Sequence, residues 1–154
     1  MRKRMRMAVV LGAAAVVGVA VPAVAASPEA DLSYHGYVAM AADEVGVWLT
    51  PRNHGPADVA GATVQVRWSL PLADQQVLPA GCVRSDARTV LCGTGPIGVG
   101  RMGKEIDLRV RLGVPSTEVT MTIDTLWVGG TVDPNHGNDQ RQVLVLDTGD
   151  VYAF

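Results

Sequence analysis

Aromatic and charged residues are both scarce in this sequence. Aromatic side chains make up 5% of its 154 residues, with a single Phe, and charged side chains make up 18%. Abundant Val and Leu, together with a net charge of only −2, exclude an intrinsically disordered chain. The same small charge excludes the strongly basic surface of a nucleic-acid-binding domain, and the length fits one domain.

The sequence has only one long apolar run, and it stands near the N-terminus. Four basic residues precede it, residues 8–20 are apolar, Pro22 follows, and Ala-Val-Ala stands at 23–25. A run of about 14 residues is shorter than the roughly 20 that a membrane span needs. We therefore predict a cleaved secretory signal peptide over residues 1–26 and a single mature domain over residues 27–154.

The predicted mature chain has no second apolar run, and no Cys directly follows the leader to carry a lipid anchor. The leader contains four of the 13 basic residues and none of the 15 acidic ones, which leaves a net charge of −6. Such a charge favours solubility and repels the domain from anionic surfaces. We expect a secreted, extracellular protein without a membrane span, and we leave loose association with the cell envelope open.

Common short motifs of catalysis are missing. The sequence has no Gly-x-Ser-x-Gly elbow, no His-Glu-x-x-His motif and no phosphate-binding glycine loop. None of its three His residues stands beside a nucleophile. We therefore expect no enzymatic activity, no catalytic residues and no cofactor. A small hydrolase whose triad assembles in space is the weakest alternative.

Cysteine is used only twice, at Cys82 and Cys92. A hairpin that turns about Ala87 places the two residues opposite each other, and Ser85–Arg88 supplies residues typical of turns. Opposed residues of an antiparallel pair lie close enough for a disulfide. We predict a structural disulfide. Free thiols and a redox or metal pair are the alternatives, but Cys-x-x-Cys spacing and further metal ligands are missing.

Most of the remaining chain alternates between apolar and polar residues, which is typical of half-buried strands with one solvated face. No segment after the leader has the period of an amphipathic helix, and clusters of Gly, Pro, Asn and Asp separate the alternating segments. The expected strands are residues 34–41, 45–53, 64–70, 106–112, 119–127 and 142–146.

Short strands separated by turns predict an all-β fold, an immunoglobulin-like Greek-key β-sandwich of about seven to nine strands. Trp68 shares a face with Val64, and such sandwiches often place a core Trp in this strand. In the segment 119–127, alternation predicts Trp127 on the same face as Val119.

Five short motifs occur in the order that they have in a family of bacterial surface-repeat domains. They are Asn53-His54-Gly55-Pro56-Ala57-Asp58, Leu78-Pro79-Ala80-Gly81-Cys82, Thr89-Val90-Leu91-Cys92, Ile97-Gly98-Val99-Gly100 and Asp133-Pro134-Asn135-His136-Gly137-Asn138-Asp139. Over residues 31–146 the chain therefore resembles the eleventh catalogued domain of unknown function, a family close to the CARDB adhesion-related domains. This resemblance implies an immunoglobulin-like sandwich, an extracellular location and no catalysis.

Two loops, at residues 53–58 and 133–139, are expected to meet at one end of such a sandwich. The candidate binding residues in them are Asn53, His54, Asp58, Asp133, Asn135, His136 and Asp139. Their oxygen atoms suit a hard cation such as Ca²⁺. The simpler interpretation, which we favour, is that the Asn and Asp side chains stabilise turns and the His residues lie on the surface. We therefore predict no metal site.

Trp48 is expected on the polar face of its strand with Gly46, while Val47 points into the core. A Trp at such a position is a candidate contact for a protein partner or a carbohydrate. The alternative is that Trp48 covers a strand edge or packs under a loop. If Leu126 and Val128 surround Trp48, the three form an exposed apolar patch, as is typical of interfaces.

These observations predict a secreted, non-catalytic domain that acts as an extracellular or cell-envelope interaction module. The expected partner is an envelope component or another secreted protein. The alternative is a soluble binder or inhibitor of a secreted protein, with residues 84–88 as its recognition loop. The sequence specifies neither the ligand nor the oligomeric state.

Overall fold

A computed structural model describes residues 26–154, so the predicted signal peptide lies outside the described residues except for Ala26. This part of the chain contains nine strands and no helix, and hence no helix that could cross a membrane. The strands are β1 (Leu32–Ala41), β2 (Glu44–Asn53), β3 (Ala62–Trp68), β4 (Cys82–Asp86), β5 (Thr89–Gly93), β6 (Ile106–Arg111), β7 (Glu118–Val128), β8 (Arg141–Leu146) and β9 (Val151–Ala153).

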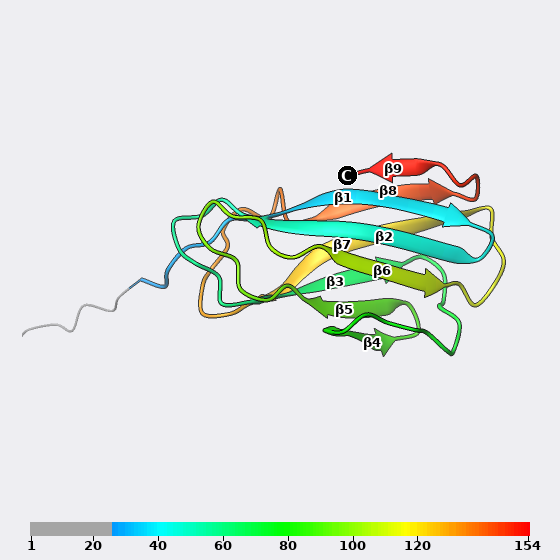
Figure 1. Ribbon diagram of the computed structural model, residues 1–154, viewed down its shortest axis with the longest axis horizontal. Coiled ribbons are helices and arrows are strands. Elements are labelled where there is room, and N and C mark those ends of the chain that lie inside the picture. The colour runs from blue at the N-terminus through cyan, green and yellow to red at the C-terminus, as the bar shows by residue number, and fades with distance from the viewer. Residues whose placement is uncertain (1–25) are drawn as a thin grey trace, which may run out of the picture.

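The strands form two antiparallel sheets that pack face to face (Figure 1). One sheet has the order β6-β2-β1-β9, and the other has the order β4-β5-β3-β7-β8. The chain crosses between the sheets after β2, β5, β6 and β8. This arrangement confirms the predicted all-β sandwich, with a strand number at the upper end of the expected range.

The core lies between the sheets and consists of alternate residues from both. In β6 the buried residues Ile106, Leu108 and Val110 alternate with exposed polar ones, as the sequence pattern predicts. Trp68 is 1% exposed, which confirms its predicted place in the core. Burial of each Val, Leu or Ile side chain in this core contributes about 1.5–3 kcal/mol to the stability of the folded state.

The expected strands are all present, with small differences in their ends. β3 ends at Trp68 instead of residue 70, and Leu70 packs against the core from outside the strand. The short strand β9 was not predicted, because three residues are too few to show a period. It follows Gly149, whose φ of 77° is a turn conformation that glycine adopts without strain. β9 pairs with residues 37–39 of β1.

The prediction for Trp127 is wrong, because β7 contains a register shift. Thr63 pairs with Trp127, whereas the next residue, Val64, pairs with Thr125 and leaves Leu126 as an extra residue. One extra residue reverses the alternation beyond it. Trp127 is therefore 60% exposed on the outer face of the five-stranded sheet. Val119, before the shift, is buried as expected.

Cys82 and Cys92 are directly opposed in the β4–β5 hairpin, and their Sγ atoms lie at disulfide distance, 2.04 Å. The predicted pairing of residues 82–84 with residues 90–92 is confirmed, but a register shift after Arg84 pairs Asp86 with Thr89 and moves the turn to residues 87 and 88. Closing a loop of this length stabilises a domain by about 2.7 kcal/mol in the chain-entropy estimate, an upper value here because the hairpin already holds the loop closed.

Candidate functional site

Trp48 lies on the outer face of the four-stranded sheet, as predicted, while Val47 and Leu49 are buried beneath it. Its strand, β2, pairs with β1 on one side and β6 on the other. Trp48 therefore does not cover a strand edge, and it is partly exposed. One of the two alternative explanations for a Trp at this position is thus removed.

Two neighbouring side chains fix the indole of Trp48. Tyr37 pairs with Trp48 across β1 and β2, and the two rings stack with centroids 4.8 Å apart and planes inclined by 19°. On β6, the guanidinium carbon of Arg109 lies 5.6 Å from the centroid of the Trp48 ring. Stacking and cation–π contacts each contribute about 0.5–1.5 kcal/mol and hold the rings in one orientation.

A hollow of about 370 Å³ lies beside this stack. Its lining includes Trp48, Arg109, Glu44, Gly46 and Gly149. It therefore combines an aromatic ring, a cationic donor and an acidic acceptor around one concave surface. We call Tyr37, Glu44, Gly46, Trp48 and Arg109 the Trp48 surface.

Leu126 and Val128 do not join this surface. They belong to β7, in the five-stranded sheet, whereas Trp48 lies on the outer face of the other sheet. The condition for an apolar patch of Trp48, Leu126 and Val128 is therefore not met. Leu126 is 57% exposed and is the sequence neighbour of Trp127, which is 60% exposed. Both residues belong to the five-stranded sheet, whereas Trp48 belongs to the four-stranded sheet.

Asn53 lies at the loop end of the sandwich and is fully buried. Its Oδ1 accepts hydrogen bonds from the N–H groups of Gly55 (3.0 Å) and Asp31 (3.4 Å). Its Nδ2 donates to the carbonyl groups of Ala57 (2.8 Å) and Ile97 (3.3 Å). The amide thus connects three segments and has no capacity left for a ligand.

Asp133 and Asn135 lie close to Asn53 through a shared neighbour, Asp31. Asp133 accepts the N–H of Leu32 at 2.6 Å and the N–H of Asn135 at 2.9 Å. The Asp31 carboxylate accepts from the side-chain amides of Asn135 (3.2 Å) and Asn138 (2.7 Å). The loop at 133–139 is thereby fastened to the start of β1.

The remaining candidate residues of these loops are more scattered. His54 Nε2 lies 3.0 Å from Ser33 Oγ, and His136 Nδ1 lies 3.3 Å from Oδ2 of the buried Asp139. Asp58 accepts the N–H of Val99 at 2.7 Å.

No set of three or more His, Cys, Asp or Glu side chains within residues 26–154 is arranged to hold a metal ion. The hydrogen bonds of Asn53 and Asp133 agree with the interpretation that these side chains stabilise turns.

Tyr34 is a buried polar residue behind these loops. Its Oη lies 2.6 Å from Thr125 Oγ1, which bridges the two sheets. Burial raises the pKa of Tyr34 well above its ordinary value, and the nearby carboxylates of Asp139, Asp133 and Asp124 act in the same direction. Tyr34 therefore stays protonated and acts as a structural hydrogen-bonding group.

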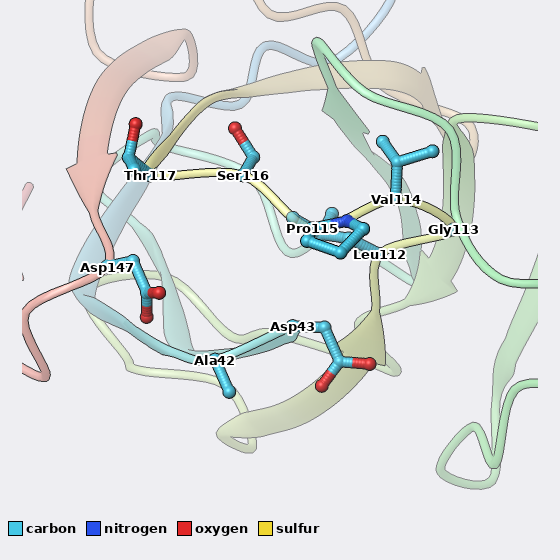
Figure 2. A pocket seen from close by; sticks show the side chains of 9 residues that line it. All are labelled: Ala42, Asp43, Leu112, Gly113, Val114, Pro115, Ser116, Thr117 and Asp147. Carbon is cyan, nitrogen blue, oxygen red and sulfur yellow. The ribbon is translucent and has the colours of Figure 1, made fainter.

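Another hollow, with a volume of about 730 Å³, lies at the opposite end of the sandwich (Figure 2). The β1–β2 turn contributes Asp43, the β6–β7 loop contributes Ser116 and Thr117, and Asp147 follows β8. The lining residues include two carboxylates and two hydroxyls, but no His, Lys or Cys.

The hairpin at 84–88, expected as a recognition loop in the alternative function, has its first residue turned inward. The Arg84 guanidinium donates to the carbonyls of Ala73 (2.7 Å), Asp74 (3.0 Å) and Leu72 (3.1 Å). It also contacts the carbonyls of residues 86 and 87. Arg84 thus fastens the loop after β3 to the hairpin and is not free to contact a partner.

Sequence analysis identified Trp48 but missed Tyr37 and Arg109. Both residues lie on the solvated face of their strands, and the alternation of polar and apolar residues indicates this position. Their meeting at Trp48 depends on the pairing register of three strands, which alternation alone does not specify.

A scan against known protein families finds no match, and searches of curated proteins and of solved structures find none either. The resemblance to the surface-repeat domains therefore stays a prediction, supported by the order of its motifs.

Proposed function

We propose that this protein is exported and acts outside the cell as a non-catalytic binding module, with the Trp48 surface as its contact site. The expected partner is an envelope component or another secreted protein. The observation that carries the proposal is the fixed stack of Tyr37 and Trp48 under Arg109, on the solvated face of a sheet. Fixed aromatic rings and Arg are the residue types that most often dominate binding energy at interfaces.

The physical reason lies in the cost of ordering side chains. A long flexible side chain loses about 0.5–1.5 kcal/mol of conformational freedom when it becomes fixed on binding. Trp48 and Arg109 already hold each other in place, so less of this cost falls on the binding step. The hollow beside them offers Glu44 and Arg109 as polar groups that select the partner.

Export belongs to the same proposal. The N-terminal sequence pattern supports it, and a cysteine pair at disulfide distance is typical of oxidising compartments. Membership of the surface-repeat family is likewise proposed on the five ordered motifs, with which the β-sandwich agrees. The alternative role as an inhibitor that presents residues 84–88 has less support, since Arg84 is engaged within the domain.

Fractionation of a culture of the native host tests this proposal. An antibody against residues 27–154 would follow the protein in the medium, the salt-washed envelope and the cell interior. Retention on the envelope, with release by salt or detergent, supports a surface module. Recovery in the medium directs the search to secreted proteins by pull-down. Recovery of the unprocessed chain inside the cell would contradict the proposal.

A further inference from the structure

The strand β8 forms an unprotected edge of the five-stranded sheet, where it pairs only with β7. The N–H of Asp147 donates to Thr117 beside β7, at 2.9 Å. Backbone groups of alternate residues point to opposite sides of a strand, so residues 142, 144 and 146 direct theirs to the open edge. Of these groups, within the described part of the chain, only the Leu146 carbonyl has a partner, the N–H of Thr148 at 2.9 Å.

Two exposed side chains of this edge are apolar, Leu144 (51% exposed) and Leu146 (38% exposed). The one charged residue of β8 is Arg141, at the start of the strand. Natural sheets usually protect an edge strand with charges, Pro or a bulge. The opposite edge strand of the same sheet, β4, has such protection, because it carries Arg84 and Asp86 and a register shift between them.

The edge of β8 is complementary to itself. When two copies of β8 pair antiparallel about Leu144, residue 142 faces residue 146 of the second copy, and the open backbone groups of both strands meet. In this register Arg141 faces Asp147 of the second copy, at both ends of the pairing. Opposite charges on facing residues stabilise a strand pair, whereas like charges destabilise it. If the pairing is centred on Val143 or Val145 instead of Leu144, Arg141 no longer faces Asp147 of the second copy.

We propose that this protein forms a symmetric dimer through β8, centred on Leu144, with the two five-stranded sheets joined into one continuous sheet. The pairing itself does not depend on the function proposed above. A two-fold axis perpendicular to the sheet keeps corresponding faces on the same side. The dimer therefore presents two Trp48 surfaces in one direction, which strengthens binding to a repetitive partner such as an envelope polymer.

Sedimentation equilibrium over a range of concentrations tests the dimer, with residues 27–154, which contain all nine strands. We expect a reversible dimer for the wild type. Leu144→Lys places two ammonium groups at the symmetry axis and should give a monomer. Val83→Lys is the matched control on β4, since Val83 is 61% exposed, and it should leave the dimer unchanged.

Charge reversal tests the register. Arg141→Asp alone, and Asp147→Arg alone, each place like charges in facing positions twice per dimer and should weaken dimerisation by about tenfold. The double variant Arg141→Asp/Asp147→Arg restores opposite charges and should restore the dimer. Thermal melting followed by circular dichroism checks that every variant folds. A wild type that is monomeric at its highest soluble concentration, or a double variant no better than the single ones, would overturn the proposal.

Discussion

The indole of Trp48 lies across Gly46, two residues earlier on the same strand, so closely that a Cβ at residue 46 would be 2.7 Å from Trp48 Cη2. Gly46 therefore provides the space in which the ring stacks on Tyr37. Trp127 has the same relationship with Gly129, again at 2.7 Å, on the other sheet. The Trp48 ring thus packs against a glycine of its own strand, and the Trp127 ring packs against a glycine of the turn that follows its strand.

Gly46→Ala should push the Trp48 ring away from Tyr37. We expect the free energy of unfolding to fall by about 1 kcal/mol, the size of one aromatic stacking contact. Urea unfolding measures this change, and near-ultraviolet circular dichroism reports the altered stack. Gly98→Ala is the control, because a Cβ there would meet no atom closer than 3.4 Å. Equal effects of the two substitutions would argue against a supporting role for Gly46.

Arg84→Lys should destabilise the domain although it keeps the charge. A lysine ammonium cannot reach the carbonyls of Leu72, Ala73 and Asp74 together, as the Arg84 guanidinium does. We expect a loss of about 2–3 kcal/mol, since hydrogen bonds from charged donors contribute about 1.5–3 kcal/mol. Arg88→Lys, in the exposed turn of the same hairpin, should be close to neutral. Denaturant unfolding of the two variants distinguishes these outcomes.

Tyr34→Phe should change how stability depends on alkaline pH. At neutral pH it removes the hydrogen bond to Thr125 and should cost about 1 kcal/mol. The raised pKa of Tyr34 means that only the unfolded state releases this proton just above pH 10. The contribution of Tyr34 is thus complete below about pH 10 and declines above it, by about 1.4 kcal/mol per pH unit. The difference between wild type and variant should therefore shrink above pH 10, and stability curves that stay parallel would contradict this assignment.

Asp133→Ala should destabilise the loop end without affecting any response to calcium. It leaves the N–H of the fully buried Leu32 without an acceptor, which costs about 2–3 kcal/mol. Since both Asp133 oxygens already accept backbone hydrogen bonds, millimolar Ca²⁺ should not raise the Tm of the wild type above that in chelator. A Tm increase in Ca²⁺ that Asp133→Ala abolishes would instead favour the cation-binding hypothesis.

Much of the fold follows from local sequence signals. The alternation in β2, β3 and β6 predicts both the strands and their buried faces, and the spacing of Cys82 and Cys92 predicts the hairpin register. These features depend on side-chain period and turn chemistry, which a single sequence contains. The exposed position of Trp127 could not be predicted, because nothing local marks Leu126 as the extra residue of a bulge.

The candidate site was predictable only in part, for the same reason. Trp48 shows its orientation through its own neighbours in sequence. The contacts of Trp48 with Tyr37 and Arg109, and those of Asp31 with the loop at 133–139, join segments far apart in the chain. Such contacts depend on strand order and register, which are properties of the whole sandwich.

A binding assay with matched Trp variants tests whether the Trp48 surface is the contact site for a partner. Residues 27–154 would be incubated with isolated envelope and with concentrated culture medium of the native host, and bound partners would be quantified for wild type, Trp48→Ala and Trp127→Ala. Both variants remove a Trp from the outer face of a sheet, but only Trp48→Ala alters the surface shared with Tyr37 and Arg109. We predict that Trp48→Ala weakens binding at least about tenfold, as expected for a dominant contact, while Trp127→Ala binds like the wild type. Binding by a folded Trp48→Ala variant that equals that of the wild type would contradict the account.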